Sequence, residues 1–175
     1  MNATAATYSV DFHSANARHE RATDSYLMEM AALFPNHTYK RLSGLNDQGC
    51  DLVLSVDGYD WNVEIKTLSG ASSKGSVYPT FCVEMFTDYA QTHRTDWRDH
   101  SNYIVFINMA TSTAHLYDSA QLEAYCSSKT LKPSGTGTGQ YGVKNKLCSW
   151  VVCVPWVCKE AGHILDVKLG GSYGN

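Results

Sequence analysis

The dipeptide Asp57-Gly58 restricts the fold of this chain most strongly, because it separates two runs of alternating apolar and polar residues. Asp-Gly favours the left-handed backbone of a two-residue turn, so the pattern predicts an antiparallel hairpin over residues 51–66. In the register that this turn imposes, the apolar side chains share one face of the hairpin. These residues are Leu52, Leu54, Val56, Tyr59, Trp61, Val63 and Ile65. The other face is predicted to be polar.

The polar face of this hairpin brings two carboxylates together. The register puts Asp51 directly opposite Glu64, with Cβ atoms about 4.5–5.5 Å apart. Like charges at this separation destabilise a hairpin, and a divalent cation with oxygen ligands offsets their repulsion. Lys66 follows Glu64 by two residues on the same face, so its ammonium is expected to reach the same place.

The pattern of Asp51, twelve intervening residues and then Glu64-Ile65-Lys66 resembles the signature of the PD-(D/E)XK nuclease superfamily. The resemblance covers residues 14–126, and Cys50 stands where the signature has proline. It implies a restriction-endonuclease-like fold and Mg²⁺-dependent hydrolysis of phosphodiester bonds, with Mn²⁺ as a substitute. It further implies that Asp51, Glu64 and the backbone carbonyl of Ile65 hold the metal. Lys66 would orient or activate the attacking water and stabilise the charge on the phosphate.

Two further acidic residues are candidate metal ligands under this resemblance. Glu20 lies on the predicted preceding helix, on the face expected to meet the sheet; the alternative is a solvated helix position. Glu84 alternates with apolar residues in a predicted strand, where an acid needs a partner. A second match to the acid-x-Lys pattern occurs at residues 166–168. It has no hairpin partner with a carboxylate, so we interpret it as a chance occurrence.

The rest of the pattern predicts a single domain over residues 1–175. Helices are expected over residues 14–34, where Pro35 ends the helix, and from 118 to about 126. Strands are expected over residues 38–42, 81–86, 103–108, 114–117 and 150–154. The nearly all-apolar segment 103–108 is expected at the centre of the sheet. This order predicts an α/β (mixed α+β) domain with a central mixed β-sheet flanked by helices.

The formal net charge of −3 excludes a protein that coats nucleic acid by bulk electrostatics, but it allows a local basic patch. No acid occurs between Glu123 and Glu160, and lysines fall there within a Gly/Lys-rich loop at about 128–147. The candidate nucleic-acid contacts are Lys74, Arg94, Arg98, Lys144 and Lys146. The alternatives are a solvated loop around the last two lysines and a segment packed by Trp97 around the arginines.

Targeting and metal-binding signals are weak elsewhere in the chain. No apolar run approaches the ~18–20 residues that span a bilayer, and residues 1–10 lack the features of a secretory signal. We therefore expect a cytoplasmic protein, encoded by a bacterium or a phage, whose six cysteines form no disulfide framework. The seven histidines show no metal-ligand spacing, so none is assigned to a metal.

These observations predict a Mg²⁺-dependent nuclease, expected to be a DNA endonuclease that pairs as a homodimer to cut both strands of a duplex. Two alternatives stay open. One is a junction-resolving or nicking enzyme of the same fold. The other is a nucleic-acid-binding or protein-interaction domain that keeps the fold and does not cleave.

Overall fold

The computed structural model of this chain describes residues 3–42, 50–72, 74–87, 90–134 and 149–170, with the backbone alone for residues 3–16. The described helices are α1 (Ala3–Leu33), α2 (Trp97–His100) and α3 (Ser119–Ser127), with the 3₁₀ turn η2 (Lys159–Ala161). The strands are β1 (Thr38–Arg41), β2 (Leu52–Val56), β3 (Tyr59–Leu68), β4 (Thr80–Phe86), β5 (Tyr103–Asn108), β6 (Thr113–Asp118), β7 (Lys132–Ser134), β8 (Ser149–Pro155) and β9 (His163–Lys168).

The strands form two sheets. The larger sheet has six strands in the order β1-β2-β3-β5-β6-β9, and the smaller has three in the order β4-β8-β7. Strands β3 and β5 pair in parallel, whereas the other neighbours in the larger sheet are antiparallel. The expected α/β class with a mixed sheet is therefore confirmed, as is the central position of β5.

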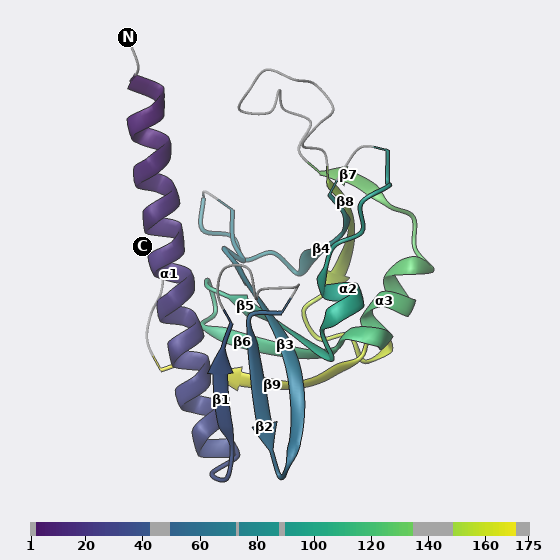
Figure 1. Cartoon of the computed structure of the whole chain (residues 1–175). Helices are drawn as coiled ribbons and strands as arrows, with labels where there is room; N and C mark the ends of the chain where they lie inside the picture. Colours follow the sequence, from purple (N-terminus) through teal and green to yellow (C-terminus); the bar gives the residue numbers. More distant parts are fainter. Residues whose placement is uncertain (1–2, 43–49, 73, 88–89, 135–148, 171–175) are drawn as a thin grey trace.

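The larger sheet buries both of its faces (Figure 1). Helix α1 covers one face with Ala22, Tyr26, Leu27 and Met30, which pack against β2, β3, β5, β6 and β9. The smaller sheet and α3 cover the opposite face, where Phe81 and Trp156 contribute to a second core. Two cores on opposite sides of one sheet make a layered α/β domain.

The hairpin predicted from Asp57-Gly58 is confirmed. Both turn residues have positive φ, 52° at Asp57 and 82° at Gly58, as a two-residue hairpin turn requires. The pairing runs from Val56↔Tyr59 to Leu52↔Val63, the register that the turn predicts. Of the apolar set, Leu52, Leu54, Val56, Val63 and Ile65 are buried beneath α1, whereas Tyr59 at the end of the hairpin is exposed. The alternate residues of β3 consequently project toward the smaller sheet.

Several boundaries differ from the predicted ones. Helix α1 begins at Ala3 rather than at residue 14, because no glycine or proline interrupts residues 3–33. Strand β7 lies inside the predicted Gly/Lys-rich loop, and residues 135–148 of that loop lie outside the described residues. Strand β9 was not predicted. It lies at the edge of the larger sheet, where exposed residues alternate with residues that are partly or fully buried. None of the described helices has the length and apolar character needed to cross a membrane.

Candidate active site

Strand β3 carries Glu64 and Lys66 on the face that points away from α1. Their register partners in the parallel strand β5 are Ile104 and Phe106, which belong to the core on that side. The Glu64 side chain is only 7% exposed, whereas the Lys66 side chain is 49% exposed, and the two form an ion pair. The ammonium of Lys66, which still reaches solvent, thus neutralises the buried carboxylate of Glu64.

Asp51 joins this pair from the end of β2. The ladder between β2 and β3 stops at Leu52↔Val63, and beyond it the Asp51 backbone N–H donates to the Val63 carbonyl at 2.9 Å. The Asp51 carboxylate accepts a hydrogen bond of 2.6 Å from the Ile65 backbone N–H. Because the N–H and C=O of one strand residue point toward the same neighbouring strand, the Ile65 carbonyl also lies on the Asp51 side of β3.

The charges of this site are partly offset within the protein. Burial alone would lower the pKa of the Lys66 ammonium, but Glu64, Asp51 and Glu84 outweigh burial and raise this pKa above its ordinary value. The Lys66 ammonium and the Ile65 N–H therefore already offset the two carboxylates that the hairpin brings together. These two groups supply part of the compensation that the hairpin pattern predicts for a divalent cation.

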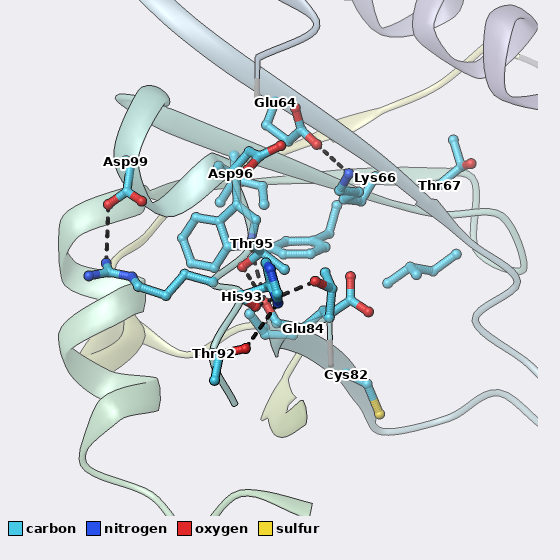
Figure 2. Close-up of a pocket in the computed structure, with 17 residues that line it drawn as sticks. Glu64, Lys66, Thr67, Cys82, Glu84, Thr92, His93, Thr95, Asp96 and Asp99 are labelled. Carbon is cyan, nitrogen blue, oxygen red and sulfur yellow. Dashed lines mark hydrogen bonds and ion pairs between the residues drawn. The ribbon is translucent and has the colours of Figure 1, made fainter. Parts of the chain in front are cut away.

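A cavity of about 810 Å³ opens beside the Glu64–Lys66 pair and is lined by β3, β4, β5 and the segment around α2. Figure 2 shows Glu64, Lys66 and Glu84 around this cavity, with Asp96 and Asp99 nearby. Glu84 comes from β4 in the smaller sheet and accepts a hydrogen bond from the Ser149 hydroxyl. The structure thus brings this predicted acid to Lys66 from a separate sheet.

Glu20 does not join this site. Its carboxylate pairs with Arg41 on β1, as does that of the neighbouring Asp24, and its side chain is 59% exposed. Helix α1 covers the sheet face that carries Ile65, whereas Glu64 and Lys66 project from the opposite face. The sheet therefore separates Glu20 from the other acids. Alternation along β3 determines that Glu64 and Lys66 face away from α1, and the pattern of the helix alone does not show this.

The structure places the predicted nucleic-acid contacts in different environments. Arg98 is not available to a phosphate backbone, because its side chain is only 7% exposed and donates to Glu123 and to the Met85 carbonyl. Arg94 lines the cavity, is 44% exposed and pairs with Glu123 and Asp99. Lys74 is exposed but does not belong to the described cavity lining. Lys144 and Lys146 lie outside the described residues.

The segment from residue 92 to 97 contributes cavity residues that the sequence argument did not assign to the site. Thr92, His93 and Asp96 line the cavity. Trp97, at the end of this segment, is buried and donates its indole N–H to the Glu84 carbonyl at 3.2 Å. The alternative in which Trp97 packs this segment is therefore confirmed. No periodicity marks His93 or Asp96, because they lie in a loop and at a helix cap rather than within a strand or helix.

The acids and cations around the cavity come from strands of both sheets, from α2 and from the loop before it, so the site exists only in the folded domain. In comparisons with known proteins, no family model, curated protein or solved structure matches this chain.

Proposed function

We propose that this chain is a metal-dependent nuclease of restriction-endonuclease-like fold that hydrolyses phosphodiester bonds in DNA, with Mg²⁺ or Mn²⁺ as cofactor. The main support for the proposal is that the fold brings Asp51 next to the segment Glu64-Ile65-Lys66. The Asp51 carboxylate binds the backbone of Ile65, and Glu64 and Lys66 pair at the wall of one cavity. The antiparallel β2–β3 hairpin beside the parallel strand β5 gives these groups a rigid base.

The donor set of this site fits Mg²⁺. Glu64 and Asp51 supply carboxylate oxygens, and Ile65 supplies a carbonyl oxygen on the same side of β3. Hard divalent cations prefer such oxygen ligands, and Mg²⁺ binds with one or two carboxylates together with the phosphate of a substrate. When bound, the metal would polarise the phosphoryl oxygen and lower the pKa of a bound water. Glu84 would assist, since it lines the same cavity and its charge acts on Lys66.

Lys66 is the group that meets the substrate phosphate in this proposal. Its ammonium is half exposed at the cavity, so it can donate hydrogen bonds to a phosphate oxygen or to the attacking water. Arg94, also at the cavity, adds a second cation to hold the backbone of the nucleic acid. The lining acids Glu64, Glu84, Asp96 and Asp99 repel a polyanion, and a bound cation would offset this repulsion.

Duplex cleavage would use two copies of the chain. One set of Asp51, Glu64 and Lys66 cuts one strand, so a homodimer is the simplest way to cut both strands of DNA. The proposal therefore includes two active sites that act on opposite strands.

The test is a cleavage assay with a matched pair of variants. Supercoiled plasmid, linear duplex, single-stranded DNA, branched DNA and RNA are incubated with the protein and Mg²⁺, Mn²⁺ or EDTA. Glu64→Gln removes a cavity carboxylate, whereas Asp60→Asn removes an exposed carboxylate of the same hairpin that accepts a hydrogen bond from the Ser55 hydroxyl. We expect metal-dependent cleavage by wild type and Asp60→Asn, and a loss of about 100-fold or more in Glu64→Gln.

The outcomes separate the alternative functions. Preference for the branched substrate would favour a junction-resolving enzyme, and single-strand nicks alone would favour a nicking enzyme. Binding without cleavage under every metal condition would reject the nuclease and favour the non-cleaving domain. Equal cleavage by Glu64→Gln and wild type would show that the reaction occurs elsewhere.

A further inference from the structure

A second cluster of ligand-type side chains lies where β9 forms the edge of the larger sheet. Asp166 Oδ1 accepts hydrogen bonds from His115 Nδ1 and from His163 Nε2, each 2.7 Å long. The three residues offer ligand atoms that all lie within 4.8 Å of one another. His115 comes from β6, whereas His163 and Asp166 come from β9, so the cluster joins two neighbouring strands.

A strand irregularity brings His163 to this cluster. His115 lies directly opposite Asp166, the next pair is Leu116↔Leu165, and then Tyr117 pairs with His163. Ile164 is left out of the ladder and is 47% exposed. In a regular strand, residues three apart point to opposite faces, and the bulge turns His163 to the face of Asp166. Bulges that re-aim a side chain in this way are common beside functional sites.

The two imidazoles are buried, and their hydrogen bonding is incomplete. The side chains of His115 and His163 are 6% and 8% exposed, and the His115 ring lies against Trp156 with 4.9 Å between ring centroids. Nε2 of His115 is buried and has no hydrogen-bond partner among the described residues. Nδ1 is the nitrogen of this ring that faces Asp166, so it is the ligand atom that His115 offers in this cluster. The Asp166 side chain, 39% exposed, leaves a path from solvent.

This cluster is separate from the candidate active site. Lys66 pairs with Phe106, Phe106 with His115, and His115 with Asp166, in one row across the sheet. Three strand spacings separate Lys66 from Asp166 along this row, or about 14 Å. Packing of Phe106 against Phe81 fills the space between them, with 4.3 Å between ring centroids. One cation cannot contact both groups.

We propose that His115, His163 and Asp166 form a binding site for a divalent transition-metal ion, Zn²⁺. Two imidazole nitrogens and one carboxylate are ligands of the type that Zn²⁺ takes, whereas Mg²⁺ prefers oxygen alone. The hydrogen bonds to Asp166 hold the ligands together before the metal arrives. On binding, the proton of each coordinating nitrogen moves to the other nitrogen of its ring, so both imidazoles stay neutral. Three protein ligands leave one position for water. The ion ties the edge strand β9 to β6.

The test uses the full chain after EDTA treatment and dialysis, with Zn²⁺ as the probe. Calorimetric titration is carried out in the Asp51→Asn/Glu64→Gln background, so that only the second cluster is measured. We expect one equivalent of Zn²⁺ to bind, and Asp166→Asn or His163→Gln to weaken binding about 100-fold or more. The control is His100→Gln, which removes an exposed imidazole on α2 and should bind as the parent does.

A second measurement does not depend on how Asp166→Asn and His163→Gln fold. X-ray absorption of the Zn²⁺-loaded protein in the same background should show nitrogen ligands at about 2.0–2.1 Å and the outer-shell scattering of two imidazoles. Failure to bind Zn²⁺, or a spectrum with oxygen ligands alone, would overturn the proposal. Equal affinity in the parent and in Asp166→Asn would overturn it as well. None of these results depends on nuclease activity, so this site and the proposed function fail or succeed separately.

Discussion

The Asp51 carboxylate accepts a 2.6 Å hydrogen bond from the backbone N–H of Ile65, the residue between Glu64 and Lys66. This bond links the end of β2 to the middle of β3, beyond the point where the ladder between the two strands stops. Asp51 is therefore a structural connection as well as a candidate metal ligand, and its two roles are separable by substitution.

Asp51→Asn and Asp51→Ala are expected to differ in stability but not in activity. Asparagine keeps an oxygen that can accept from Ile65, whereas alanine leaves that N–H without its acceptor. The free energy of unfolding should fall by about 1–3 kcal/mol in Asp51→Ala and much less in Asp51→Asn. Metal-dependent cleavage should be lost in both variants. Thermal denaturation and the plasmid assay measure the two effects, and equal melting temperatures for the variants would argue against a stabilising role for this hydrogen bond.

Lys66→Met should reduce cleavage by about 100-fold or more and also destabilise the domain. The substitution leaves the buried Glu64 carboxylate without the ammonium that neutralises it. The double variant Glu64→Gln/Lys66→Met removes that charge and should recover part of the lost melting temperature without recovering activity. Lys159→Met, an exposed lysine of η2, is the control for the loss of a positive charge. Full activity in Lys66→Met would remove Lys66 from the proposed chemistry.

Substitution of Arg98 should mainly affect stability, whereas substitution of Arg94 should mainly affect substrate binding. Arg98 is buried between Glu123 and the Met85 carbonyl, and its guanidinium lies 5.3 Å from the centroid of the Phe86 ring. Arg98→Ala is therefore expected to lower the free energy of unfolding by on the order of 3 kcal/mol. Arg94→Ala should cost less stability and instead weaken DNA affinity and its dependence on salt. Denaturant melts and binding titrations over a range of salt measure both. The reverse result would return Arg98 to the nucleic-acid interface.

Cys82 and Cys153 should form a disulfide when the folded protein is oxidised. They lie directly opposite each other in β4 and β8, both are exposed, and their Sγ atoms are 3.7 Å apart. Treatment with diamide removes two electrons and two protons from the thiols, and a small rotation of the side chains brings the sulfurs to bonding distance. Mass spectrometry of peptides should find this link, and Cys153→Ser should prevent it. Because Cys82 lines the cavity, the oxidised protein should bind substrate differently.

Cys126 provides a buried reference thiol for the exposed Cys82 and Cys153 in an alkylation experiment. Its side chain is buried on α3, and burial raises the pKa of its thiol to about 12. A thiol of this pKa is about one part in ten thousand thiolate at pH 8, so it should resist iodoacetamide in the folded protein. Alkylation of Cys126 at the rate of Cys153 would mean that α3 does not pack as the structure has it.

Local sequence determined the hairpin, its register and the sharing of one face by Glu64 and Lys66. These follow from the positive φ that Asp57-Gly58 adopts and from the alternation of side chains along a strand. The same alternation predicted that apolar residues such as Leu52 and Ile65 are buried together. The predicted start of a helix at Asp118 is also confirmed, since the Asp118 side chain accepts a hydrogen bond from the Gln121 N–H at the start of α3.

Only the tertiary structure decided which other residues meet these groups. The sheet separates Glu20 from Glu64, and the packing of the second sheet brings Glu84 to Lys66. The three residues of the proposed zinc site have no ligand spacing in the sequence, because strand pairing joins His115 to Asp166 across 51 positions and a bulge turns His163 toward them. Alternation and turns act over a few residues, whereas the neighbours of a strand depend on packing between distant segments, for which a single sequence carries no local signal.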